Sequence, residues 1–366
     1  MAERGAAPSV PAAQRRALRV LRSFSSPLLP DDYLELFNPL WSTRELRGRI
    51  ERVERHLAPA ATIVIKPGGE WPGHLPGQYV RLGVQVDGVY HWRAYSLTSD
   101  PARADGRIAI TPKLVPEGTV SPFLCQRARP GMIVRLGGVE GSFVLPDPLP
   151  PQLLFISAGS GITPIMSMLR SLASSGGLND VVHLHSDRTE ASVIFADELQ
   201  SLALRNGGYR MRGRISGREG RLSPGALQEL CPDWRERDTF LCGPSGLLRT
   251  MRAHWQQAGD PLRLHTEHFQ PDEQLACGGH GSGGSVLFCN SGVHAHSDGT
   301  QPILLAGEQA GASLAHGCRM GICHSCVGTL RAGRVRDLRT GRVHGQPGEA
   351  VRICINAPEG PVEIDL

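Results

Sequence analysis

The run Gly317–Cys326 is the feature that most restricts how this chain can fold. Within it, Cys318, Cys323 and Cys326 follow a C-x4-C-x2-C pattern, and a fourth thiol, Cys354, lies in a short hydrophobic run further along. Thiols at this spacing are typical ligands of a [2Fe–2S] cluster, and glycines let a loop approach such a cluster closely. The sequence therefore predicts four metal ligands: Cys318, Cys323, Cys326 and Cys354.

Two other interpretations of these cysteines stay open. A structural zinc site could use them with His316 or His324, although zinc sites more often pair short C-x-x-C spacings. Disulfides are disfavoured because the first 30 residues carry several Arg and no apolar core of a signal peptide. The nine cysteines form no regular disulfide framework, so a reducing cytoplasm suits them better. Apart from Cys242, which belongs to a motif described below, the remaining ones are expected to be structural: Cys125, Cys231, Cys277 and Cys289.

Length and composition restrict the class of protein. A chain of 366 residues is too long for one compact core, so we expect two or three domains. The net charge of +4, without a basic stripe carrying aromatics, argues against nucleic acid as a partner. No apolar run approaches the roughly 20 residues of a membrane span.

The character of the sequence changes several times along the chain. We expect an N-terminal extension over 1–45, partly disordered and partly helical, that packs on the next domain or lies on a membrane surface. Short strands separated by turns over 46–148 predict a small antiparallel barrel. Hydrophobic strands alternate with helical stretches over 149–269, which predicts a parallel sheet. A Gly-rich linker over 270–284 precedes a last domain over 285–366.

Four short motifs accompany the cysteine run. Arg93-Ala94-Tyr95-Ser96 ends a strand, and Gly118-Thr119-Val120-Ser121 precedes an apolar stretch. Ala158–Pro164 and Leu241–Pro244 each follow a strand and precede a helix. Together, these motifs resemble a ferredoxin reductase fused to its own plant-type ferredoxin. The resemblance implies a multidomain fold: an antiparallel β-barrel for FAD, an α/β parallel-sheet nucleotide domain and an α+β (β-grasp) ferredoxin domain.

For the barrel, the resemblance implies a flavin site. Arg93 would pair with a pyrophosphate, the Tyr95 ring would lie against the isoalloxazine, and the Ser96 hydroxyl would reach flavin N5. A second turn for phosphate favours FAD over FMN. A plain strand with a buried Tyr and a simple helix cap at Ser121 stay open as alternatives. The expected flavin ligands are Arg93, Ala94, Tyr95, Ser96, Gly118, Thr119, Val120 and Ser121.

For the nucleotide domain, the resemblance implies a nicotinamide site. Glycines after the first strand let a pyrophosphate approach the start of a helix, whose dipole favours negative charge. The family's Cys-Gly-Pro places its Cys beside nicotinamide C4 and flavin N5, so Ser96 and Cys242 are the expected catalytic residues. A small buried hydrophobe is the alternative for Cys242, as is a core aromatic for Phe269. The expected ligands are Gly159, Ser160, Gly161, Thr163, Ser186, Arg188, Cys242, Gly243, Pro244 and Phe269.

The choice of nucleotide depends on the residues after the second strand of this domain. A 2′-phosphate requires a hydroxyl and a guanidinium, which Ser186 and Arg188 offer, whereas a ribose diol requires an acid. Asp187 lies between them and would suit NADH. On balance, NADPH is favoured.

Other catalytic classes find little support. There is no G-x-S-x-G nucleophile elbow. His183/His185 and His294/His296 alternate along strands, which is typical of surface or hairpin positions and does not indicate an oxygen-activating metal site.

The resemblance implies a function in electron transfer. Electrons would pass from NADPH through FAD and a [2Fe–2S] cluster to an external oxygenase. The acceptor most resembled is a membrane acyl-CoA (stearoyl-CoA) desaturase, because the N-terminal extension is similar to the leader of actinobacterial reductases that serve such enzymes. The protein would then be cytoplasmic, at the inner face of the membrane with its partner. Two alternatives stay open: an NADH-dependent reductase of a soluble Rieske-type ring or steroid hydroxylase, and an iron–sulfur/flavin sensor without turnover.

Overall fold

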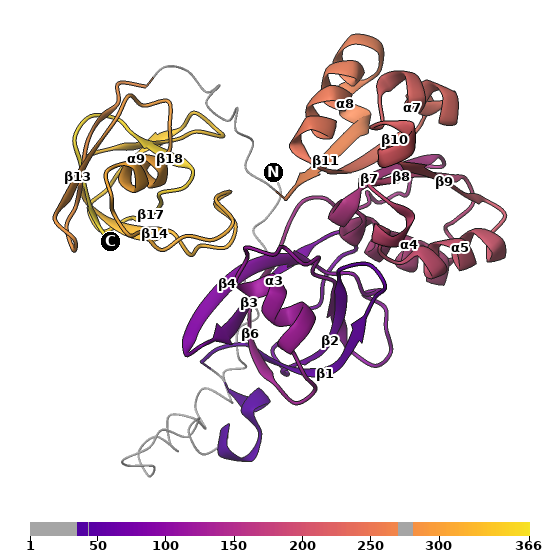
Figure 1. Cartoon of the computed structure of the whole chain (residues 1–366), viewed down its shortest axis with the longest axis horizontal. Coiled ribbons are helices and arrows are strands. Elements are labelled where there is room, and N and C mark those ends of the chain that lie inside the picture. Colours follow the sequence, from indigo (N-terminus) through magenta and orange to yellow (C-terminus); the bar gives the residue numbers. More distant parts are fainter. Residues whose placement is uncertain (1–34, 43, 270–280) are drawn as a thin grey trace. The chain divides into compact units, whose positions relative to one another are not determined.

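The computed structural model describes residues 35–42, 44–269 and 281–366 (Figure 1). Most of the expected N-terminal extension, residues 1–34, and Cys277 lie outside these ranges. Among the described segments, none of the helices has both the length and the apolar character needed to cross a bilayer.

An antiparallel sheet of six strands follows a short 3-10 helix, η1 (Pro39–Trp41). The sheet has the order β4-β3-β6-β1-β2-β5. An antiparallel bridge between Leu97, which follows β4, and Ile110 of β5 joins the two edges, so the sheet closes on itself. The predicted FAD-type β-barrel is confirmed. Its strands are β1 (Arg47–Arg55), β2 (Ala61–Pro67), β3 (Tyr79–Val86), β4 (Val89–Ser96), β5 (Ile108–Ile110) and β6 (Ile133–Glu140).

The apolar stretch after Gly118-Thr119-Val120-Ser121 is helical. The helix begins within the motif itself, as α3 (Val120–Pro122), and continues as a π-helical turn, η2 (Phe123–Arg127). Val120 and Leu124 are buried in the apolar core of the barrel, together with residues such as Ile63 and Leu82. This packing fixes the turn Gly118–Ser121 relative to the strands.

A second sheet has the order β11-β10-β7-β8-β9, and β10, β7, β8 and β9 run parallel. The chain passes from β7 through β8 to β9, then crosses to β10 on the other side of β7. The carboxyl ends of β7 and β10 therefore form the switch point where such sheets bind ligands.

The strands are β7 (Leu153–Ala158), β8 (Val181–Asp187), β9 (Tyr209–Ile215), β10 (Asp238–Gly243) and β11 (Leu264–His268). The helices are α4 (Ile162–Ser175), α5 (Ala196–Arg205), α6 (Ser216–Glu219), α7 (Pro224–Leu230) and α8 (Ser245–Ala258), with 3-10 turns η3 (Gly159–Gly161), η4 (Glu190–Ser192), η5 (Trp234–Glu236) and η6 (Pro261–Arg263).

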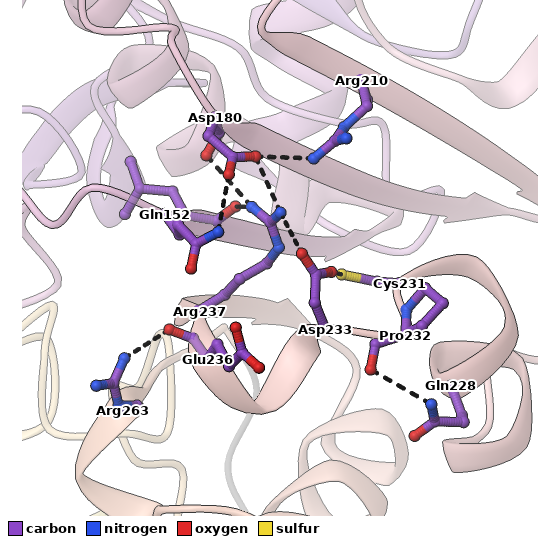
Figure 2. A network of polar contacts seen from close by, with 11 residues as sticks. Gln152, Asp180, Arg210, Gln228, Cys231, Pro232, Asp233, Glu236, Arg237 and Arg263 are labelled. Atoms are coloured by element: carbon purple, nitrogen blue, oxygen red, sulfur yellow. Dashed lines mark hydrogen bonds and ion pairs between the residues drawn. The ribbon is translucent and has the colours of Figure 1, made fainter.

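A buried arginine holds the opposite, amino ends of these strands (Figure 2). Arg237, which precedes β10, is 1% exposed, and its guanidinium bonds to Asp233 at 2.5 Å and to Asp180 at 2.9 Å. Asp180 precedes β8 and also accepts hydrogen bonds from Gln152, which precedes β7, at 2.9 Å and from Arg210 of β9 at 2.8 Å. The sheet is therefore tied together at the edge away from its switch point.

The C-terminal part is an α+β fold with two small sheets, as predicted. The larger sheet has the order β13-β12-β19-β14-β17, with β12 and β19 parallel, and the smaller has the order β16-β15-β18. Their apolar core includes Phe288, Ile303 and two cysteines, Cys326 and Cys354. The elements are β12 (Gly284–Phe288), β13 (Val293–Ser297), α9 (Ile303–Gln309), β14 (Val327–Ala332), β15 (Val335–Asp337), β16 (Val343–His344), β17 (Ala350–Arg352), β18 (Asn356–Pro358) and β19 (Val362–Asp365).

The end of the predicted linker is fastened to this part. The backbone N–H and hydroxyl of Ser282 donate to Glu359 at 3.3 and 2.9 Å, and Gly360 donates to the carbonyl of Gly283 at 2.7 Å. Arg336, nearly fully buried, holds Glu359 at 2.6 Å. Residues 281–284 are thus attached to the sheet, while the other domain boundaries stay predictions.

Candidate functional site

The loop between α9 and β14 brings backbone N–H groups to the predicted cluster ligands. The sulfur of Cys318 accepts hydrogen bonds from the N–H groups of Met320, Ile322 and Cys323, at 3.4, 3.3 and 3.3 Å. The sulfur of Cys354 accepts one from Gly321 at 3.1 Å. Donors of this kind stabilise negative charge on sulfur, as the thiolate ligands of an iron–sulfur centre require.

The four thiols interact in two pairs. A hydrogen bond from the Cys318 thiol lowers the pKa of Cys323 and raises that of Cys318 itself. A hydrogen bond from Cys354 in the same way lowers the pKa of Cys326 and raises that of Cys354. A centre with two irons needs two protein ligands on each, so the residues fit the group, and we propose that each pair holds one iron.

Backbone conformation gives the cluster loop its shape. Gly321 has a φ of +72°, and a Cβ at this position would lie 2.5 Å from Cδ1 of Ile355. Arg319 also has a positive φ, +55°, and its guanidinium forms two hydrogen bonds with Glu308 of α9, at 2.8 and 2.5 Å. The ion pair holds the loop to the helix, and it neutralises the charge of Arg319.

The predicted flavin residues Arg93, Ala94, Tyr95 and Ser96 form the end of β4. Ser96 is 7% exposed, and Tyr95 packs partly against the apolar core of the barrel. Arg93 Nη1 donates to the adjacent carbonyl of Trp92 at 2.8 Å, which orients the guanidinium. Their roles toward FAD stay proposals.

The predicted phosphate turn Gly118–Ser121 closes on itself. The N–H of Gly118 donates to the carbonyl of Val115 at 2.9 Å, and the N–H of Val115 donates to the hydroxyl of Ser121 at 3.1 Å. A Cβ on Gly118 would lie 3.1 Å from that carbonyl and 3.2 Å from that hydroxyl. The turn is therefore tightly packed at its start, and Thr119 and Val120 lie between these two ends.

The two motifs of the predicted nicotinamide site meet at the switch point. Gly161 lies in η3, after β7, and an ideal Cβ on it would be 2.1 Å from the carbonyl oxygen of Cys242, at the end of β10. The hydroxyl of Thr163 donates to the carbonyl of Ser160 at 2.9 Å and stabilises the turn. Cys242 is fully buried, and burial raises the pKa of its thiol well above the ordinary value, so it stays protonated. Gly243, the last residue of β10, and Pro244 connect this strand to α8. Phe269 follows β11 and is 36% exposed.

The carboxylate of Asp187, at the end of β8, is bonded to other groups of the protein. Its carboxylate accepts hydrogen bonds from the N–H of Arg188 and the hydroxyl of Ser192, both at 2.7 Å, and forms an ion pair with Lys113 at 3.2 Å. It is 7% exposed. Ser186 is also buried, whereas Arg188 is exposed.

The expectation that His183 and His185 lie at the surface is wrong. They are 0% and 2% exposed, and the hydroxyl of Ser157 bridges His183 Nε2 and His185 Nδ1, each at 2.8 Å. Burial lowers the pKa of His185 to about 4 and that of His183 well below its ordinary value, so both stay neutral near neutral pH. Strands inside a parallel sheet are covered on both faces, so alternation along β8 did not indicate exposure. His294 and His296 are exposed, as expected.

Sequence reasoning missed Lys113. Its ammonium, paired with Asp187, would lie 3.7 Å from a Cβ on Gly159, next to the turn expected to bind pyrophosphate. No local pattern could identify it, because it follows a barrel strand and lies 74 residues from Asp187 in the chain.

Comparisons with known proteins agree with this arrangement. Three family models match in order: an oxidoreductase FAD-binding domain over 70–145, an oxidoreductase NAD-binding domain over 155–253, and a 2Fe-2S iron-sulfur cluster binding domain over 287–358. The chain is 47% identical to an NADPH oxidoreductase of Mycobacterium tuberculosis, covering 98% of this chain and 96% of the relative. It is 32% identical to the ferredoxin reductase component of the 3-ketosteroid-9-alpha-monooxygenase of the same species, covering 72% and 76%.

A solved structure supports the fold. Phthalate dioxygenase reductase aligns with a TM-score of 0.57 at 21% identity, covering 87% of this chain and 97% of that one. The expected cofactors FAD, NAD(P)H and a [2Fe–2S] cluster are confirmed, and the cluster domain replaces the zinc interpretation of the cysteines. The chain thus belongs to the ferredoxin reductase-type NAD(P)H oxidoreductases, in which FAD-binding and NAD-binding domains are joined to a [2Fe–2S] domain.

Proposed function

We propose that this chain carries electrons from NADPH through FAD and its [2Fe–2S] cluster to an external oxygenase. The support is that residues suited to all three groups occur in one chain, and that relatives are named as reductase subunits of a glycine betaine monooxygenase and of a ketosteroid monooxygenase. A bound flavin takes two electrons together from a nicotinamide and can pass them on singly to a one-electron centre.

The protein's own residues bind and orient in this scheme. Gly159, Ser160 and Gly161 would hold the nucleotide at the switch point, where the buried side chain of Cys242 would shape the position of the nicotinamide. The hydroxyl of Ser96 would face flavin N5. No acid–base pair is required, so the task of the protein is positioning and electrostatics.

We infer NADPH as the donor from the environment of Asp187. Its carboxylate is already bonded to the Arg188 N–H, Ser192 and Lys113, so it has little capacity left for a ribose diol. The exposed guanidinium of Arg188 and the hydroxyl of Ser186 then suit a 2′-phosphate.

Kinetics with both nucleotides test this inference. R188A should raise KM for NADPH by about 10-fold or more, the effect of losing a hydrogen bond to a charged group, and leave KM for NADH nearly unchanged. R205A, which removes an exposed arginine of α5, is the matched control. An equal effect on both nucleotides would exclude a 2′-phosphate contact.

For the acceptor, we propose a membrane acyl-CoA (stearoyl-CoA) desaturase. Besides the resemblance of the N-terminal extension, three apolar side chains within it are strongly exposed: Leu36 at 77%, Phe37 at 83% and Trp41 at 53%. Aromatic and apolar groups of this kind favour a membrane interface, so we place the protein in the cytoplasm, at the inner face of the membrane.

Two assays test this acceptor. Membranes holding the desaturase should oxidise NADPH and desaturate stearoyl-CoA only when this protein is added, and the protein should float with lipid vesicles. Replacing Phe37 and Trp41 by Ser should weaken flotation without changing flavin reduction. Absence of desaturation with active membranes would reject this acceptor.

A soluble Rieske-type ring or steroid hydroxylase is the second candidate. The ketosteroid monooxygenase reductase among the relatives favours it. It is supported if the protein reduces such a hydroxylase, with NADH as good a donor as NADPH, and does not float with vesicles. A sensor without turnover would reduce neither acceptor.

A further inference from the structure

We propose that Arg352 raises the reduction potential of the cluster through the peptide group between Gly321 and Ile322. Arg352 Nη1 donates a hydrogen bond to the carbonyl of Gly321 at 2.9 Å. The N–H of that same peptide group belongs to Ile322 and donates to the sulfur of Cys318 at 3.3 Å. One peptide group thus connects a cation to a proposed iron ligand. The inference rests on the bound cluster, not on the choice of acceptor.

The fold fixes Arg352 in this position. It ends β17 and pairs with Val327 of β14, and the next residue, Ile353, donates its N–H to the carbonyl of Cys326 at 3.1 Å. The side chain of Arg352 is half-buried. Because the strand and the loop are both anchored next to the cysteines, the guanidinium has a defined place.

The charge of Arg352 is not neutralised by a carboxylate in the part of the chain that the structure describes. Arg319, the other guanidinium bonded to the cluster-loop region, contrasts with it because Glu308 accepts two of its hydrogen bonds. Arg352 therefore contributes a net positive charge beside the loop, and Arg319 contributes an ion pair.

Two physical effects act in the same direction. A cation on a carbonyl polarises the peptide group, and hydrogen bonds in a chain strengthen one another, so the Ile322 N–H becomes a better donor to sulfur. The uncompensated charge also favours the more negative state of its surroundings. Reduction adds one electron to the centre with no bond formed or broken, so both effects stabilise the reduced form and raise its potential.

Redox titration of the full-length protein, loaded with FAD and cluster, tests this proposal. R352Q removes the charge, and R352K keeps the charge but loses the planar guanidinium. R334Q is the control, because Arg334 is an exposed arginine of the same domain for which no bond to the cluster loop is present among the described residues. The midpoint potential is followed by the EPR signal of the reduced cluster under anaerobic conditions.

We expect R352Q to lower the equilibrium constant for cluster reduction about tenfold, which is about 59 mV for one electron. R352K should lie between R352Q and the wild type, and R334Q should match the wild type within twofold. The proposal is overturned if R352Q changes the constant less than twofold, or if R334Q changes it as much. Should R352Q assemble no cluster, R352K decides: a measurable decrease supports the proposal, and a wild-type potential refutes it.

Discussion

Replacing Gly161 by Ala tests the geometry of the nucleotide site most sharply. Gly161 has φ −61° and ψ −8°, which alanine adopts readily, so space is the obstacle. The added Cβ would lie 2.1 Å from the carbonyl oxygen of Cys242, against the 3.4 Å at which ordinary contact begins. One of the two loops must therefore move by about 1.3 Å.

A displacement of this size should act on hydride transfer. Misplacing reacting groups by about 1 Å can cost 10²-fold in rate, so we expect the limiting rate of flavin reduction to fall by about 10²-fold in G161A. The assay is anaerobic stopped-flow absorbance of the flavin at increasing NADPH concentration. FAD content and the EPR signal of the dithionite-reduced cluster should stay at wild-type levels.

Gly213 of β9 provides the control, because a Cβ there would meet nothing within 4 Å. G213A should reduce its flavin at the wild-type rate. If G161A binds FAD and reaches the wild-type limiting rate, the close approach of the two loops does not position the nicotinamide, and this part of the reasoning is refuted.

Further substitutions test other parts of the structure. G321A should fail to assemble the cluster, because its Cβ would lie 2.5 Å from Cδ1 of Ile355 in a backbone of φ +72°; iron analysis checks this. R237M should lower the free energy of unfolding, measured by urea titration, by about 3 kcal/mol. This is the lower end of the range for breaking a buried ion pair, because the carboxylate partners of Arg237 are partly exposed. The hydrogen bond from Arg237 lowers the pKa of Asp233 to about 2. The ionised Asp233 therefore stabilises the fold above about pH 4, and this contribution is lost as the pH falls toward 2. D233N should flatten this decline in the free energy of unfolding, measured by urea titrations at several pH values. C242A should slow flavin reduction by NADPH, with unchanged FAD content.

Local sequence patterns predicted those parts of the protein that depend on neighbours in the chain. Hydrophobic runs alternating with helical stretches predicted the parallel sheet, whose parallel strands are β7, β8, β9 and β10. The spacing of the cysteines identified thiols that the fold brings together in two pairs. Glycine motifs after β7 and β10 lie at the switch point, as their positions after strands implied.

Such local patterns could not predict contacts between residues that lie far apart in the chain. Lys113 contacts Asp187 only because the barrel and the parallel sheet pack together. This ion pair occupies the Asp187 carboxylate, which the sequence alone left available for a ribose diol. The burial of His183 depends on the two strands that flank β8, which its own sequence does not show. Arg352 likewise reaches the carbonyl of Gly321 across 31 residues of chain.

The most direct test of the central claim is an anaerobic titration of the purified protein with NADPH, and separately with NADH. Visible absorbance follows the flavin, and low-temperature EPR follows the cluster. We expect NADPH to bleach the flavin and produce the signal of a reduced [2Fe–2S] cluster, with NADH less effective. A bleached flavin without a cluster signal would contradict electron transfer to the four cysteines, and no bleaching with either nucleotide would contradict the reductase function itself.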